Sequence, residues 1–145
     1  MARKGLVMGN SNSRYHAEEF RRIFVREFTY LQGFLRNTHR YGGKTALTCP
    51  IRSLSWTYAE IDQAANRLAD ALRRDGVGKG DVVIYQLFNC AEFVFLYLAP
   101  QKLGAVNCPI NFRLSYGETA YILDDSKPKV YFYDAELSAT AEAAL

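Results

Sequence analysis

The clearest pattern of apolar and polar positions in the chain lies between Asp81 and Asn111. Residues 82–87 form a short apolar run rich in β-branched side chains, which is typical of a strand buried in a parallel sheet. Residues 91–103 are apolar on nearly every side, a pattern that predicts a buried helix. Residues 105–110 then predict a second buried strand. Because two parallel strands need a crossover, this stretch predicts a right-handed β-α-β unit.

Capping residues mark where the predicted helices begin and end. Asn89, with Glu92 three residues later, predicts a capping box at the start of the 91–103 helix, and Gly104 predicts its end. Two more capping boxes, over residues 57–60 and 115–118, predict the starts of two further helices.

The N-terminal part of the chain predicts a different arrangement. Residues 1–15 have no apolar period and predict a flexible lead-in. From residue 16, apolar positions recur every three or four residues, which predicts a helical region. Thr29 offers a start for a second helix within it, and Gly42-Gly43 ends it. Two β-type runs at 46–49 and 54–56 then predict a short hairpin.

The remaining elements complete the predicted fold. The helix from Tyr58 is predicted to bury Leu68 and Leu72 where it meets the sheet, and residues 129–133 predict a further strand. An Ala-rich helix follows from residue 135. The alternation of strands and helices predicts an α/β fold of βαβαβ order, with a mostly parallel sheet and flanking helices, preceded by the helical region and the hairpin.

Composition limits the classes of function. The chain has 145 residues, 49% hydrophobic and 23% charged, which suits one globular domain. A formal net charge of +3 gives no strong reason to expect nucleic acid or an anionic membrane as a partner. No apolar run reaches the roughly 18 to 20 residues of a membrane span. The three cysteines are scattered and form no CxxC pair, which favours free thiols in a reducing compartment. The N-terminal residues contain no signal-peptide core, so a cytoplasmic location is expected.

Local candidates for chemistry are few. Cys90 at a helix N-terminus suggests a low-pKa nucleophile, but a small residue at a tight turn is the favoured interpretation. Asp124 and Asp125 suggest a metal pair, yet at a helix end before a Pro turn they read better as solvated acids. The Gly-rich turn 76–81 contains a lysine but precedes a strand, so no helix N-terminus faces it. The sequence therefore predicts no catalytic residue and no metal site in this chain.

Seven short marks, each weak alone, occur in one order over residues 29–137. Together they resemble the front of the adenylate-forming acyl-CoA synthetases, the AMP-binding superfamily that also holds luciferases and peptide-synthetase adenylation domains. The marks are Trp56-Thr57-Tyr58-x-Glu60, Ala65-Asn66-Arg67-Leu68-Ala69, Gly80-Asp81-x-Val83, Asn89-x-x-Glu92-Phe93, Lys102-x-Gly104-Ala105-Val106, Asn111-x-Arg113-Leu114 and Tyr121-Ile122-Leu123-x-Asp125-Ser126.

The resemblance implies a two-step ligase. A carboxylic acid reacts with ATP, assisted by Mg²⁺, to give an acyl-AMP, and coenzyme A then displaces AMP to give the thioester. Residues 16–145 would be the opening part of an acetyl-CoA synthetase-like N-terminal domain. The family's phosphate loop and the lysine of its mobile C-terminal domain have no counterpart in the 145 residues. We therefore expect this chain to be inactive alone and to bind none of these cofactors.

The resemblance also implies a role for one residue. In coenzyme A ligases of this family, an arginine in the loop matching Asn111-Phe112-Arg113 can lie near the nucleotide phosphates of coenzyme A. Arg113 is thus the candidate cofactor-binding residue, because a guanidinium at the carboxyl end of a strand can make charge-assisted contacts to phosphate. The alternative is that Arg113 only fixes its loop or the following helix.

Two other functions stay open at this point. The first is a non-catalytic α/β module that binds a partner chain, such as the rest of a ligase, or self-associates through exposed apolar surface. The second is a flavodoxin-like or dinucleotide-binding domain, which is disfavoured because the turns 88–90 and 111–113 lack phosphate-cradling glycines. The reading frame past Leu145 separates the ligase from the module. Fatty, aromatic and alicyclic acids all remain candidate acyl substrates.

Overall fold

A three-stranded parallel sheet forms the centre of the molecule. The computed structural model describes residues 28–145, so the predictions for residues 1–15 and for the start of the helical region lie outside the described residues. The strands are β3 (Val82–Gln86), β4 (Val106–Pro109) and β5 (Val130–Tyr133), in the order β4-β3-β5. β3 pairs in parallel with both neighbours. Helix α4 (Ala91–Lys102) joins β3 to β4, and α5 (Tyr116–Ser126) joins β4 to β5, which confirms the predicted α/β class.

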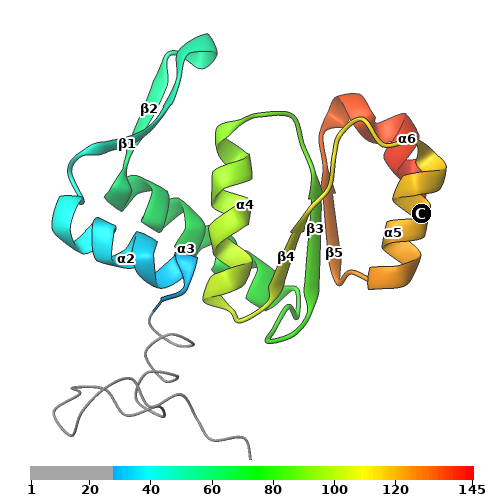
Figure 1. The fold of residues 1–145 in the computed structure, drawn as a ribbon, viewed down its shortest axis with the longest axis horizontal. Helices are drawn as coiled ribbons and strands as arrows, with labels where there is room; N and C mark the ends of the chain where they lie inside the picture. The colour runs from blue at the N-terminus through cyan, green and yellow to red at the C-terminus, as the bar shows by residue number, and fades with distance from the viewer. Residues whose placement is uncertain (1–27) are drawn as a thin grey trace, which may run out of the picture.

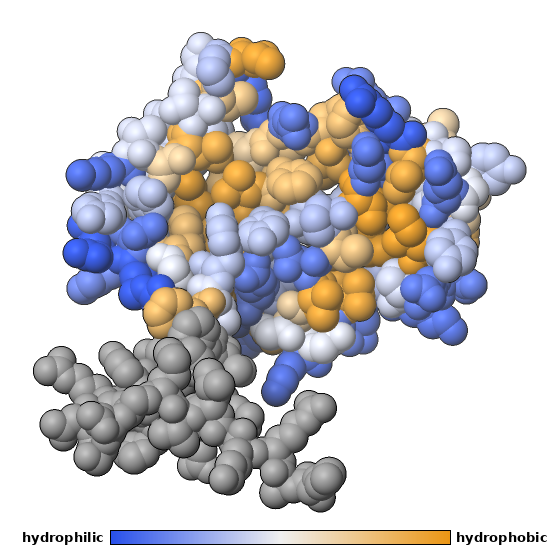
Figure 2. Space-filling model, viewed as in Figure 1, coloured by the Kyte–Doolittle hydropathy of each residue, from blue (hydrophilic) through white to orange (hydrophobic). Residues whose placement is uncertain are grey.

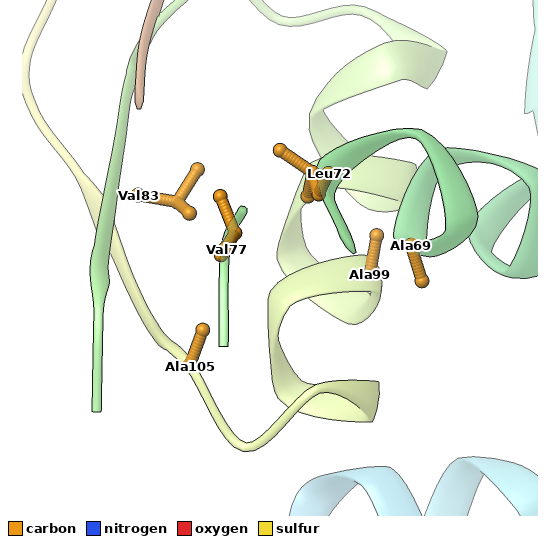
Figure 3. Close-up of a cluster of buried hydrophobic side chains, with 6 residues drawn as sticks. All are labelled: Ala69, Leu72, Val77, Val83, Ala99 and Ala105. Carbon is orange, nitrogen blue, oxygen red and sulfur yellow. The ribbon is translucent and has the colours of Figure 1, made fainter. Parts of the chain in front are cut away.

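The helices cover both faces of this sheet. Figure 1 shows α3 (Tyr58–Arg74) and α4 on one side of the strands, with α5 and α6 (Ser138–Ala143) on the other. Between α3, α4 and the sheet lies a buried apolar cluster, in which Leu72 and Val77 point toward Val83 (Figure 3). A second cluster, on the α5 side, contains Ile84, Ile110 and Leu123.

The two predicted buried strands turn out to be different. In β3, Val83, Ile84 and Tyr85 are fully buried, as predicted. The prediction is wrong for β4, because Val106 is 51% exposed, Pro109 is also exposed, and the two residues between them are only half-buried. The reason is strand order: among the described residues β4 lies at an edge of the sheet, so it has a strand neighbour on one side only.

The prediction for the start of α4 is also wrong. The N-cap is Cys90, which makes no side-chain capping hydrogen bond. Asn89 therefore lies one residue outside the helix, and Glu92 occupies the second helical position, where a capping box cannot form. Instead, the Glu92 carboxylate accepts a hydrogen bond from Arg52 at 2.9 Å. The end is as predicted, since α4 stops at Lys102 and Gly104 has a φ of +71°.

The helix and hairpin before the sheet agree with the sequence pattern. Helix α2 (Tyr30–Tyr41) is capped by the Thr29 hydroxyl, which accepts from the Gln32 N–H, and it ends at Gly42. Strands β1 (Thr45–Cys49) and β2 (Leu54–Thr57) form an antiparallel hairpin joined by a 3₁₀ turn, Pro50–Arg52. The hairpin projects from the body (Figure 1), and its tip, at the top of Figure 2, is partly hydrophobic and partly polar. Ile51 in the 3₁₀ turn is 97% exposed.

Both remaining capping boxes form as predicted. Thr57 with Glu60 opens α3, and Ser115 with Glu118 opens α5. The prediction that Leu68 and Leu72 are both buried holds for Leu72 only; Leu68 is partly exposed. The Ala-rich C-terminal segment is a 3₁₀ turn, Ala135–Leu137, followed by α6. No helix among residues 28–145 is long and apolar enough to cross a membrane.

Candidate functional site

The carboxyl ends of the three strands meet at one edge of the sheet. The backbone N–H of Ile110, after β4, donates to the Tyr85 carbonyl of β3 at 3.0 Å. On the other side, the N–H of Asp134, after β5, donates to the Gln86 carbonyl at 3.0 Å. Ligands of open α/β sheets bind outside this edge, so the loops that follow the strands form the candidate site.

The loop after β4, residues 111–114, is held by its own first residue. The Asn111 side-chain oxygen accepts from the Arg113 backbone N–H at 2.9 Å. The Asn111 backbone carbonyl accepts from the Leu114 N–H at 3.2 Å. The Asn side chain thus closes a local turn of the kind that Asn and Asp commonly form. The capping box of α5 begins directly afterwards, at Ser115.

Arg113, the candidate cofactor-binding residue, is exposed on this loop. Its guanidinium carbon lies 5.2 Å from the centre of the Phe112 ring. The Phe112 ring in turn contacts Phe88 of the loop after β3, with ring centres 4.8 Å apart. No ion pair to Arg113 occurs within residues 28–145. The loops after β3 and β4 therefore meet through two aromatic rings and present one uncompensated cation.

Beneath the loop lies a buried polar side chain that sequence reasoning missed. Gln86, the last residue of β3, is 0% exposed. Its amide nitrogen donates to the Asn111 carbonyl at 3.0 Å and lies 3.5 Å from the Thr119 hydroxyl. Its amide oxygen accepts from the Tyr131 hydroxyl of β5. One signal was available: a glutamine within an otherwise apolar strand needs buried partners.

The rejected candidates have structural explanations. Burial raises the pKa of the Cys90 thiol, which argues against an activated nucleophile. In the turn 76–81, the Gly78 N–H already donates to the Asp81 carboxylate at 2.9 Å, so that amide is not available to a phosphate. Across residues 28–145, no group of three or more His, Cys, Asp or Glu side chains could hold a metal ion. Cys49, Cys90 and Cys108 are free thiols.

A cleft of about 510 Å³ opens near the same edge, between α3, α4 and β5. Its lining is mainly apolar. The apolar lining residues are Ala64, Leu68, Leu87, Phe95, Leu96 and Phe132.

Comparison with known proteins identifies the family. A family model described as "AMP-binding enzyme" matches residues 34–145. The chain belongs to this family of AMP-binding enzymes. The match confirms the resemblance that the seven marks carried, and it covers the sheet, the loop 111–114 and Gln86 of this AMP-binding chain.

Individual relatives of this AMP-binding chain are coenzyme A ligases. It is 41% identical over 95 residues to the 3-hydroxybenzoate/4-hydroxybenzoate–CoA ligase of Thauera aromatica, covering 66% of this chain and 18% of the ligase. It is 42% identical over 94 residues to the long-chain-fatty-acid–CoA ligase FadD13 of Mycobacterium tuberculosis, covering 65% and 19%. The chain therefore spans about a fifth of the length of the curated relatives it matches.

Solved structures agree. The crystal structure of the N-terminal domain of FACL13 from Mycobacterium tuberculosis matches with a TM-score of 0.75 and 36% identity, covering 80% of this chain and 30% of that one. The predicted fold, part of the N-terminal domain of an acyl-CoA ligase, is confirmed.

Proposed function

We propose that this chain is the opening part of an ATP-dependent acyl-CoA synthetase, which converts a carboxylic acid, ATP and coenzyme A into acyl-CoA, AMP and pyrophosphate through an acyl-AMP. The supporting observation is the alignment of its parallel sheet with the N-terminal domain of FACL13 at 36% identity. Relatives that act on hydroxybenzoates and on long-chain fatty acids leave aromatic and aliphatic acids as candidate substrates.

The proposal includes a division of labour along the enzyme. Residues 16–145 form part of the N-terminal domain, with residues 1–15 as a lead-in, and the phosphate loop and C-terminal domain belong to the longer protein. ATP and Mg²⁺ are then bound elsewhere, and the 145-residue chain alone is inactive. Three free thiols suit a reducing compartment, which supports a cytoplasmic enzyme.

Arg113 is the residue to which we assign a ligand. Its guanidinium is exposed, stands at the carboxyl edge of the sheet and has no ionic partner within the described residues. A planar guanidinium makes paired, charge-assisted hydrogen bonds to phosphate oxygens. We therefore assign Arg113 to the phosphates of coenzyme A.

An alternative function is a non-catalytic module that binds a partner chain. The cleft of about 510 Å³ favours it, because open apolar surface of this kind marks a place where another surface packs. The same surface would let isolated chains self-associate. The alternative predicts a complex with a ligase chain and no ligase activity in any protein that begins with these residues.

The deciding experiment compares this chain with the product of the reading frame that continues past Leu145. Both proteins are assayed for acid-dependent exchange between ATP and pyrophosphate, with a panel of fatty, aromatic and alicyclic acids. We expect exchange only with the longer protein, followed by thioester formation when coenzyme A is added. A stop codon after Leu145, or a longer protein without exchange on any acid, would favour the partner-binding module.

A further inference from the structure

Gln86 has an unusual position for a glutamine. It is fully buried at the end of the central strand, where an apolar side chain would avoid the cost of desolvating an amide. Both ends of its amide are used: the nitrogen donates to the Asn111 carbonyl, and the oxygen accepts from the Tyr131 hydroxyl. A buried network with every group satisfied is rigid and specifies one geometry.

The hydrogen bond to Asn111 extends the sheet beyond its last backbone pairing. On the β3–β4 side, that last pairing is the Ile110 N–H to the Tyr85 carbonyl. One residue further on, the Gln86 side chain takes over and holds the Asn111 carbonyl at 3.0 Å. The next loop residue is thus tied to the middle of the sheet by a side chain rather than by the backbone.

Tyr131 fixes which way the Gln86 amide faces. A hydroxyl that donates to one end of the amide requires the oxygen there, which leaves the nitrogen for Asn111. Burial raises the pKa of the Tyr131 hydroxyl, so it stays a proton donor at neutral pH. Contacts from Tyr131 of β5 and Thr119 of α5 therefore converge on the Gln86 amide. The same amide holds the loop residue Asn111.

Asn111 transmits this geometry to Arg113. Its side chain accepts from the Arg113 backbone N–H at 2.9 Å, and its carbonyl, the one that Gln86 holds, also accepts from the Leu114 N–H. A shift of Asn111 therefore moves the backbone from which the guanidinium extends. We propose that Gln86 is a positioning residue, which sets the loop 111–114 so that Arg113 meets the phosphates of coenzyme A. This rests on the function proposed above for Arg113.

Three variants separate this role from general stability. Gln86→Leu removes the amide at similar volume. Tyr131→Phe removes only the donor to the amide oxygen and leaves the bond to Asn111 in place. Leu72→Ala opens a cavity in the cluster on the α3–α4 side and serves as the matched control, because it lowers stability without touching the loop.

The first measurement is hydrogen exchange of the 145-residue chain. In Gln86→Leu, the Arg113 and Leu114 amides should exchange about 10-fold faster than in the wild type. In the wild type, local opening of the loop must break the hydrogen bond from Gln86 to Asn111, and in the variant that bond is absent. The rates are read relative to Val83 in β3, which reports global opening. Tyr131→Phe should show a smaller change, and Leu72→Ala none after this correction. If Gln86→Leu does not fold, Gln86→Met takes its place, since the unbranched methionine side chain has similar length and no N–H for Asn111.

The second measurement uses the longer enzyme and the Michaelis constants of its substrates. Gln86→Leu should raise the KM for coenzyme A roughly 3- to 10-fold, because a small displacement of a binding group weakens its contact. The KM for ATP should stay unchanged. Leu72→Ala should leave both Michaelis constants unchanged. If Gln86 had only a structural role, Gln86→Leu would behave like Leu72→Ala and would also leave both constants unchanged.

The two measurements distinguish the possible failures. The positioning role would be overturned if the loop amides of Gln86→Leu show no faster exchange once the rates are corrected for global opening at Val83. This holds whatever the KM for coenzyme A is in Arg113→Ala. Faster loop exchange with an unchanged KM for coenzyme A in Arg113→Ala would overturn the coenzyme A role of Arg113, and with it the purpose assigned to Gln86. Selective loop opening together with a raised KM for coenzyme A supports both.

Discussion

Lys102 of α4 donates a hydrogen bond to the Asp62 carboxylate of α3 at 2.6 Å. The two side chains are only 13% and 21% exposed, so water screens this pair much less than the ion pair between Arg73 and Asp70, whose side chains are 68% and 61% exposed. The pair joins the two helices that cover one face of the sheet.

Removing one member of this pair should destabilise the chain. Lys102→Met leaves the Asp62 carboxylate half-buried without its cation, and we expect a loss of about 1.5 to 3 kcal/mol in the free energy of unfolding. Asp62→Asn in the Lys102→Met background should recover part of it, since the uncompensated charge is then gone. Arg73→Met is the control and should cost about 0 to 1 kcal/mol. Denaturant unfolding in parallel decides; equal losses at Lys102 and Arg73 would contradict the prediction.

The neighbouring leucines of α3 should respond differently to truncation. Leu72 is 2% exposed within the main cluster, so Leu72→Ala should cost about 2 to 5 kcal/mol of unfolding free energy. Leu68 borders the open cleft, and water can fill the space that Leu68→Ala leaves. Its loss should therefore fall below that of Leu72→Ala. Chemical denaturation of both variants tests the order, and a larger loss at Leu68 would show that the cleft is closed in solution.

The capping box of α5 should make stability depend on pH. Hydrogen bonds from the Ser115 hydroxyl and backbone N–H hold the pKa of the Glu118 carboxyl below its usual value. Because the pKa is lower in the folded chain, the stabilisation is complete above the unfolded value of about 4.3. It disappears as the pH falls through the lowered value. Thermal unfolding should thus show Glu118→Gln less stable than the wild type at pH 7, with the gap closing in acid. A gap of constant size across this range would refute the assignment.

The coenzyme A role of Arg113 predicts a selective kinetic defect. Losing one charge-assisted contact of about 1.5 to 3 kcal/mol corresponds to roughly 10- to 150-fold in apparent affinity. In the longer enzyme, Arg113→Ala should raise the KM for coenzyme A by that factor and leave the adenylation half-reaction unchanged. Arg113→Lys should restore only part, since a point charge lacks the planar fork. Equal damage to both half-reactions would indicate that Arg113 only stabilises its loop.

Sequence reasoning succeeded where the deciding contacts are local. The capping box of Thr57 and Glu60 spans four residues, and the apolar run of β3 contains its own evidence. The prediction that Asn89 caps α4 was wrong because the capping residue depends on the direction in which the chain leaves β3, and that direction is set by tertiary structure. The prediction that the strand containing Val106 is buried was wrong because strand order, which the sequence pattern does not reveal, places β4 at an edge of the sheet.

The polar network at the candidate site was harder still to predict. Tyr131 reaches Gln86 across 45 positions, and no pattern in a single sequence pairs them. Arg113 could be nominated only through the family resemblance, because nothing in its immediate neighbours distinguishes it from any other exposed arginine. The structure adds its exposure and the turn that presents it.

The strand order has a consequence for how the chain folds as it leaves the ribosome. β3 is the first of the three strands to be synthesised, and it becomes the middle one. β4 can dock on one flank as soon as α4 has emerged, and β5 then takes the opposite flank. When β4 or β5 is synthesised, its pairing partner β3 has therefore already been synthesised, and no later segment has to insert between the paired strands. Nascent chains fold from their N-terminal side, and an order that grows outward from its earliest strand suits that direction.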